Sequence, residues 1–139
     1  MVAKMKKELI SVIMPVYNCE AYVLQAAYSV LASLYPNIEL LIYNDGSTDG
    51  TKEILEYLVD PRVKIIHSEK NKGVSFARNA LLDIAQGSLI ALQDADDVSM
   101  PNRFTLQSQS LLNSDLVFVC SPLRIMNKGN ILYYETDVQ

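Results

Sequence analysis

The sequence predicts an α/β fold with a mostly parallel, Rossmann-like sheet that carries helices on both faces. Short apolar runs alternate with segments of helical periodicity, and this alternation is typical of parallel sheets with crossover helices. The first run, Leu9 to Pro15, is almost continuously apolar, as expected for a strand covered on both faces. No internal repeat or linker interrupts the pattern, so we expect a tail of residues 1–8 followed by one domain over 9–139.

The helices follow from apolar residues at helical spacing. The segment from about Tyr22 to Leu34 has only one narrow polar stripe, which predicts a largely buried helix. The segment from about Ser75 to Ala85 repeats apolar residues at i, i+3, i+4 and i+7, and Gly87 suits its C-terminal end. The other two expected helices lie at about 51–58 and 102–112.

Further apolar runs predict the other strands, which we expect at about 38–43, 63–67, 88–93, 116–120 and, after a turn at 127–130, 131–134. If the first four strands lie in the order 3-2-1-4, that order reverses between strands one and four. Open α/β sheets bind their ligands at such a reversal, outside the carboxyl ends of the strands.

Three polar segments stand where predicted strands end, and they would line one crevice at that edge. They are Pro15-Val16-Tyr17-Asn18, Asn44-Asp45-Gly46 and Gln93-Asp94-Ala95-Asp96-Asp97. Clustered carboxylates supply the oxygen ligands that Mg²⁺ and Mn²⁺ prefer, and Mg²⁺ is usually held by one or two carboxylates plus substrate phosphates. The alternative for the acidic segment alone, a turn or helix cap, stays open because Asp is favoured at both.

Composition excludes several classes of protein. The net charge of −4 argues against a nucleic-acid partner, which needs a basic face. No apolar stretch is long enough for a transmembrane helix, and the N-terminus lacks the pattern of a signal peptide. Cys19 and Cys120 lie far apart and suit reduced thiols, so we expect a cytoplasmic protein. Lysines in the tail suit a solvated segment with a weak preference for a membrane surface.

Familiar phosphate-binding motifs are absent from the sequence. Neither the glycine-rich fingerprint of nicotinamide-binding sites nor the P-loop motif occurs. Receiver domains and phosphatases with an Asp-x-Asp nucleophile place their acidic pair after strand one, where this chain has Tyr17-Asn18.

Four motifs in order resemble the N-terminal, nucleotide-sugar-binding half of family 2 inverting glycosyltransferases. They are Val12 to Asn18, Asn44 to Asp49, Asn71-Lys72-Gly73 with Ala77-Arg78-Asn79, and Asp94 to Asp97 followed by Pro101 and Arg103. The resemblance covers about 8–137. It implies the nucleotide-binding portion of a GT-A fold, a nucleotide-sugar donor with UDP as the favoured nucleotide, and Mg²⁺ or Mn²⁺ as cofactor.

The resemblance also implies roles for particular residues. Tyr17 would lie against the nucleobase, Asp45 would accept a hydrogen bond from it, and Arg78 would reach the base or the diphosphate. Asp96 would be the main metal ligand, and Asp94 would reach the ribose or the metal. Each of these residues also has a purely structural alternative. Tyr17 could be a core aromatic, Asp45 a turn residue and Arg78 a surface charge on a helix. The full expected site comprises Pro15, Tyr17, Asn18, Asp45, Arg78, Asp94, Ala95 and Asp96. Many relatives have Asp where this chain has Asn44, which puts a direct role for Asn44 in doubt.

The catalytic half implied by the family does not match any part of this chain. Inverting transfer needs a general base, and relatives carry an Asp for it well beyond the metal motif, so we expect the base beyond Gln139. Three readings remain open: a donor-binding half that is weak or inactive alone, a binding module completed by a partner chain, and a receiver-like interaction domain. The acceptor could be a polysaccharide, a lipid-linked glycan or a protein. Apolar surface left uncovered would favour self-association.

Overall fold

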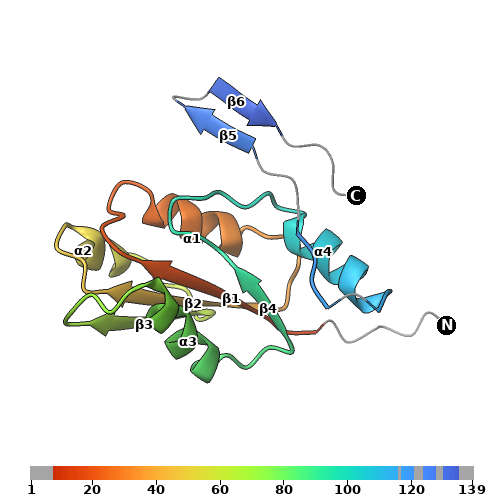
Figure 1. Ribbon diagram of the computed structural model, residues 1–139, viewed down its shortest axis with the longest axis horizontal. Helices are drawn as coiled ribbons and strands as arrows, with labels where there is room; N and C mark the ends of the chain where they lie inside the picture. Colours follow the sequence, from red (N-terminus) through yellow and green to blue (C-terminus); the bar gives the residue numbers. More distant parts are fainter. Residues whose placement is uncertain (1–7, 116, 121–123, 128–129, 135–139) are drawn as a thin grey trace.

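The computed structural model describes residues 8–115, 117–120, 124–127 and 130–134. Four parallel strands form the main sheet in the order β3-β2-β1-β4 (Figure 1). Their bounds are Ile10–Val16 for β1, Ile38–Asp45 for β2, Val63–Ser68 for β3 and Leu89–Leu92 for β4. The order reverses between β1 and β4, as the sequence predicted, so the carboxyl ends of these strands meet at one edge.

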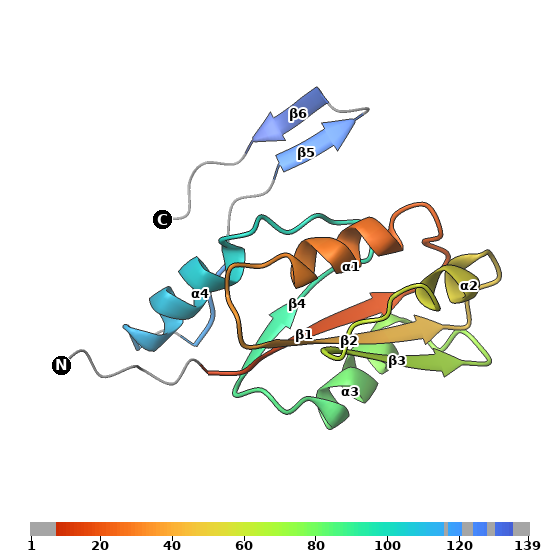
Figure 2. The same ribbon diagram turned by 180° about the vertical axis from the view of Figure 1, so that it is seen from behind.

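Helices cover both faces of this sheet, which confirms the predicted fold class (Figures 1 and 2). Apolar side chains of three helices pack into one core with the even-numbered residues of β1 and β2. A fourth helix packs Ala77 and Leu81 on the opposite face, against Ile13, Leu41 and Tyr43. The first three are α1 (Val23–Leu31), α2 (Thr51–Leu55) and α4 (Arg103–Leu112), and the fourth is α3 (Val74–Ile84).

Two helices end earlier than the sequence predicts. Helix α1 ends at Leu31, three residues early, because the chain turns there and the Leu34 amide donates to the carbonyl of Pro101 at 2.8 Å. Helix α2 ends at Leu55 rather than at 58. Leu58 is nevertheless buried in the same core, so the predicted inward face of this segment is correct.

The predicted strand at 116–120 is wrong for its described residues, 117–120, which form no strand. Val117 is 97% exposed and Phe118 is 73% exposed. An apolar run becomes a strand only when a neighbouring strand satisfies its backbone hydrogen bonds. Two later strands, β5 (Arg124–Asn127) and β6 (Asn130–Tyr134), pair antiparallel in a separate sheet. Leu116, residues 1–7 and residues 128–129 of the predicted turn lie outside the described residues.

The edge strand β4 is covered on one face only. Leu89 and Ala91 pack against the core that contains α1. Ile90 and Leu92 point to the opposite face and are 43% and 53% exposed, and neither belongs to the core cluster that Ala77 and Leu81 of α3 form there. Within the described residues, no helix combines the length and the apolar character needed to cross a bilayer.

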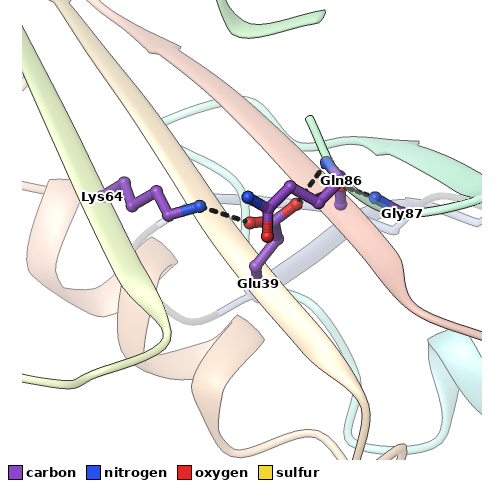
Figure 3. A network of polar contacts seen from close by, with 5 residues as sticks. Glu39, Lys64, Gln86 and Gly87 are labelled. Carbon is purple, nitrogen blue, oxygen red and sulfur yellow. Dashed lines mark hydrogen bonds and ion pairs between the residues drawn. The ribbon is translucent and has the colours of Figure 1, made fainter. Parts of the chain in front are cut away.

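A buried carboxylate ties the amino ends of the strands together on the α3 face (Figure 3). Glu39 of β2 is 7% exposed. Its carboxylate accepts hydrogen bonds from the Ser11 hydroxyl at 2.6 Å, the Gln86 amide at 2.8 Å and the Lys64 ammonium at 3.1 Å. The Ser11 oxygen in turn accepts from the Gly87 amide at 2.8 Å. The network therefore joins three strands to the segment between α3 and β4.

The network makes a testable contribution to acid stability. Burial by itself raises the pKa of Glu39, but the hydrogen bonds from Ser11, Gln86 and Lys64 together outweigh burial and hold that pKa below its ordinary value. A lowered folded-state pKa gives stability that is present above the unfolded pKa and lost as pH falls through the folded pKa. We expect Glu39→Gln to lower the free energy of unfolding by about 1–3 kcal/mol at pH 7. The difference from wild type should shrink below about pH 4.5. Urea titrations at pH 7, 5, 4 and 3 measure it, and a pH-independent difference would contradict the linkage.

Candidate functional site

A pocket of about 200 Å³ opens at the carboxyl edge of the sheet. Its walls come from the ends of β1 and β2, from the loop after β3 and from the first turns of α3. The lining residues are Pro15, Val16, Tyr17, Asp45, Asn71, Gly73, Val74 and Ala77. The structure therefore brings Pro15, Tyr17 and Asp45 together, as expected from the order of the strands.

Tyr17 is 46% exposed in the wall of this pocket. That exposure excludes the alternative of a core aromatic. An exposed ring in a pocket wall is accessible to a planar ligand, and aromatic rings stack favourably in offset arrangements.

Asn18 joins the loops that follow β1 and β2. Its backbone φ of 50° lies in the left-handed region, which Asn tolerates better than most residues. In this conformation its amide donates to the Ser47 hydroxyl oxygen at 3.0 Å, and its side-chain oxygen accepts from the Thr48 amide at 2.8 Å. The Asn18 side chain therefore braces the site and is committed to Thr48.

A second set of contacts strengthens the same junction. The Cys19 amide donates to the Thr51 hydroxyl oxygen at 2.9 Å, and the Gly50 amide donates to the Glu20 carboxylate at 2.6 Å. The Glu20 amide donates to the Asp49 carboxylate at 3.2 Å. We call the two joined loops, residues 17–20 and 46–51, the rim of the pocket.

Asp45 anchors the loop after β3 as well as lining the pocket. The residue is 3% exposed, and its two carboxylate oxygens accept from the amides of Lys72 and Gly73, each at 2.8 Å. A carboxylate has about four acceptor positions, so two bonds leave capacity for a donor on a ligand. A purely structural role in the turn accounts for the bonds to Lys72 and Gly73 but not for the position of Asp45 in the pocket wall.

Arg78 and Asp94 meet across the site. Arg78 lies in the first turns of α3, and its Nη2 atom is 3.4 Å from Oδ1 of Asp94. The two side chains are 38% and 58% exposed, so the ion pair itself adds little stability. Its significance is positional, because it brings a guanidinium next to the acidic segment at the carboxyl edge of the sheet, although neither residue lines the pocket itself.

The acidic turn of residues 94–97 presents carboxylates outward. Ala95 is 5% exposed and packs in the core with α1, so its methyl group faces away from solvent while Asp94 and Asp96 are exposed. Burial raises the pKa of Asp97, and the neighbouring charges of Asp94 and Asp96 raise it further. Burial also raises the pKa of the Cys19 thiol, and the negative charge of Asp96 raises it further.

These residues fit a divalent cation that is completed by phosphate oxygens. The mutual repulsion of the carboxylates is relieved by a cation, and no described residue pairs with the Asp96 carboxylate. In the described part of the chain, no three His, Cys, Asp or Glu side chains gather closely enough to hold a metal alone. One or two carboxylates plus substrate phosphates is the usual arrangement for Mg²⁺.

Sequence reasoning missed part of the pocket. Asn71, Gly73 and Val74 line it, although only Arg78 of that motif had been assigned a role. The signal was the position of the Asn71-Lys72-Gly73 loop at the carboxyl end of β3, where it meets the ends of β1 and β2.

The comparisons with known proteins agree with this geometry. A family model described as glycosyl transferase family 2 matches residues 11–137. The chain belongs to glycosyltransferase family 2. Its fold is of the GT-A type, and membership in this family sets aside the receiver-like alternative.

Curated relatives in the family are bacterial glycosyltransferases. The chain is 37% identical over 125 residues to the Escherichia coli UDP-Glc:alpha-D-GlcNAc-diphosphoundecaprenol beta-1,3-glucosyltransferase WfgD, covering 89% of this chain and 49% of that protein. It is 36% identical over 114 residues to the putative teichuronic acid biosynthesis glycosyltransferase TuaG of Bacillus subtilis, covering 81% and 45%. This chain thus spans about half the length of these relatives.

Two solved structures share the fold. S. aureus TarS in complex with UDP-GlcNAc superimposes with a TM-score of 0.69 at 29% identity, over 75% of this chain and 31% of that chain. The mannosyltransferase PcManGT from Pyrobaculum calidifontis, in complex with GDP-Man and Mn²⁺, superimposes with a TM-score of 0.66 at 21% identity, over 72% and 31%. At that identity the second likeness shows the fold alone.

Proposed function

We propose that this chain binds a nucleoside-diphosphate sugar, with a UDP-sugar favoured, together with Mg²⁺ or Mn²⁺, as the donor half of an inverting glycosyl transfer. The observation that supports the proposal is that the pocket at Tyr17 and Asp45, the Arg78–Asp94 ion pair and the acidic turn all lie at the carboxyl edge of the parallel sheet. An aromatic ring, a guanidinium and clustered carboxylates suit a planar base, a diphosphate and a divalent cation, respectively. The UDP-GlcNAc complex of TarS supports the choice of nucleotide.

Each part of the donor has a partner of suitable chemistry. The base stacks on Tyr17 beside Pro15, and its ring N–H donates to the free acceptor positions of Asp45. The guanidinium of Arg78 exchanges Asp94 for diphosphate oxygens, which match its planar geometry. Asp96, assisted by Asp94, holds the cation, and a bound cation offsets charge on the leaving nucleoside diphosphate.

The proposal also covers the general base and the acceptor. We place the base beyond Gln139 and expect the chain alone to be weak or inactive in transfer. A second candidate is a nucleotide-sugar-binding module completed by a partner chain. The acceptor is a polysaccharide, a lipid-linked glycan or a protein, and a lipid-linked one would bring a cytoplasmic chain to the membrane surface.

Calorimetry with UDP tests the proposal. We expect binding in the presence of Mn²⁺ that weakens in EDTA, and Asp96→Ala should weaken the Mn²⁺-dependent binding at least about tenfold, since charge-assisted contacts typically contribute about 1.5–3 kcal/mol. Asp83→Ala removes an exposed carboxylate of α3 that lies outside the site, and it is the matched control.

Two outcomes would overturn the assignment. Equal UDP affinity in Mn²⁺ and in EDTA would show that donor binding does not depend on a metal. Absence of binding to UDP, GDP and dTDP at millimolar concentration would show that the pocket is not a donor site. Transfer that appears only after a partner chain is added would favour the binding module over the incomplete catalytic domain.

A further inference from the structure

The side chain of Gln93 lies beneath the acidic turn. Gln93 is the residue before Asp94 and is 3% exposed. Its Nε2 atom donates to the carbonyl oxygen of Asp94 at 3.1 Å and to that of Asp97 at 2.9 Å. One amide group therefore holds both ends of the turn that carries Asp94 and Asp96.

The oxygen of the same amide is also fully engaged. Oε1 of Gln93 accepts from the Ser99 hydroxyl at 2.6 Å and from Nη1 of Arg103 at 2.8 Å. A glutamine amide offers two donors and about two acceptor positions, so all four are used. A fully satisfied buried amide has one preferred orientation, since any rotation breaks several bonds.

Arg103 fixes this cluster to the strand and to the neighbouring helices. As the first residue of α4, it donates from Nη2 to the carbonyl of Leu92, the last residue of β4, at 2.8 Å. Its Nη1 also donates to the Ser99 hydroxyl at 2.8 Å. The Ser99 amide donates to the Ser29 hydroxyl oxygen of α1 at 2.9 Å. The acidic turn is thus held from below by β4, α1 and α4.

We propose that Gln93 and Arg103 are positioning residues for the donor, which set the place of the Asp94 and Asp96 carboxylates by holding the backbone between them. The inference rests on the proposed function, because it assumes that these carboxylates bind the metal and the diphosphate. Neither residue touches the donor. Their substitution acts on the metal-diphosphate part of binding and spares the base pocket at Tyr17 and Asp45, which other contacts hold.

Two ligands separate this role from a general contribution to folding. Because the proposed function assigns Asp94 and Asp96 to the metal, uridine binding depends on the base pocket alone, whereas binding of UDP with Mn²⁺ also needs the acidic turn. A residue that merely stabilises the fold would change both affinities together or neither. A positioning residue lowers the affinity for Mn²⁺-UDP while the affinity for uridine stays unchanged.

The principal variant is Gln93→Met, which keeps the length of the side chain and removes its four hydrogen bonds. We expect it to weaken Mn²⁺-UDP binding at least about tenfold, the size typical of lost supporting contacts around a metal site, and to change uridine binding less than about twofold. Arg103→Lys, which cannot reach Leu92, Ser99 and Gln93 together, should act in the same direction.

A milder pair of variants provides a matched control. Ser99→Ala and Ser11→Ala each remove a buried hydroxyl, 6% and 0% exposed, that donates at 2.6 Å to a side-chain oxygen. Ser99 contacts Gln93 below the acidic turn, whereas Ser11 lies at the opposite end of the sheet with Glu39. Only Ser99→Ala should lower the ratio of Mn²⁺-UDP affinity to uridine affinity.

The outcomes distinguish the inference from the function on which it rests. Failure of the wild type to bind Mn²⁺-UDP would overturn the proposed function and this inference with it. Wild-type binding combined with an unchanged affinity ratio in folded Gln93→Met would overturn the inference alone. If Gln93→Met does not fold, an unchanged ratio in Ser99→Ala overturns it instead.

Discussion

Gly87→Ala is expected to destabilise the protein by about 3 kcal/mol or more, at the upper end of overpacking effects. A Cβ atom at Gly87 would lie 2.5 Å from the Leu9 carbonyl oxygen, 2.7 Å from the Ser11 nitrogen and 2.8 Å from Ser11 Oγ. Two of these atoms belong to the backbone where β1 begins, so they cannot rotate away. Relief requires the segment before β4 to move outward, which breaks the bond from the Gly87 amide to Ser11 and disturbs the Glu39 network.

Urea unfolding followed by far-ultraviolet circular dichroism measures this effect. Gly50→Ala is the control, because its Cβ would meet Oε2 of Glu20 at 2.8 Å, the far end of a flexible side chain. We expect Gly50→Ala to cost less than about 1 kcal/mol, as a surface change that a rotamer can accommodate. Equal midpoints for the two variants would contradict the argument from backbone contact.

Gly46→Ala is expected to weaken binding of uridine at least about tenfold, because displacements near 1 Å can cost a factor of 10² at a binding site. Gly46 has φ of +67°, and its Cβ would lie 2.5 Å from the Lys70 carbonyl carbon and 2.6 Å from the Asn71 nitrogen. The segment 70–73 must therefore move. That segment lines the pocket and donates two amides to Asp45, so both walls of the base pocket change.

The left-handed conformation adds about 1–2 kcal/mol of destabilisation for a residue with a Cβ. Stability and binding must therefore be measured together, by urea unfolding and by calorimetry with uridine. Asp83→Ala, which removes an exposed carboxylate of α3 outside the pocket, serves as the control. Wild-type uridine affinity in folded Gly46→Ala would show that the 70–73 segment does not shape the pocket.

The sheet and its ligand-binding edge were predictable from sequence because they depend on local patterns. Apolar runs such as 9–15 reveal buried strands, and polar residues after them reveal the edge where ligands gather. Gly87 illustrates the limit. Its sequence position suggested a helix terminus, yet helix α3 ends at Ile84 and the glycine is needed for contact with Leu9, which no local pattern encodes.

Gln93 and the predicted strand at 116–120 also show what local sequence patterns cannot predict. The role of Gln93 was not predicted, whereas the strand was predicted and does not form over 117–120. The polar character of Gln93 was visible, but its four partners come from the turn, from Ser99 and from α4, so its role exists only in the folded chain. The run at 116–120 has apolar strand-forming residues without a partner strand for 117–120. In both cases the outcome depends on which hydrogen-bond partners the folded chain supplies.

The rim has a kinetic consequence. Because Asn18, Glu20 and Thr51 bind the two loops to each other before any ligand arrives, a nucleotide encounters a surface that is already shaped. Little loop ordering then opposes association. Loosening the rim should act chiefly on how long the complex lasts, since changes within one interface alter dissociation more than association. If the chain binds a nucleotide as proposed, the residence time of that nucleotide is therefore set partly by the contacts between these two loops.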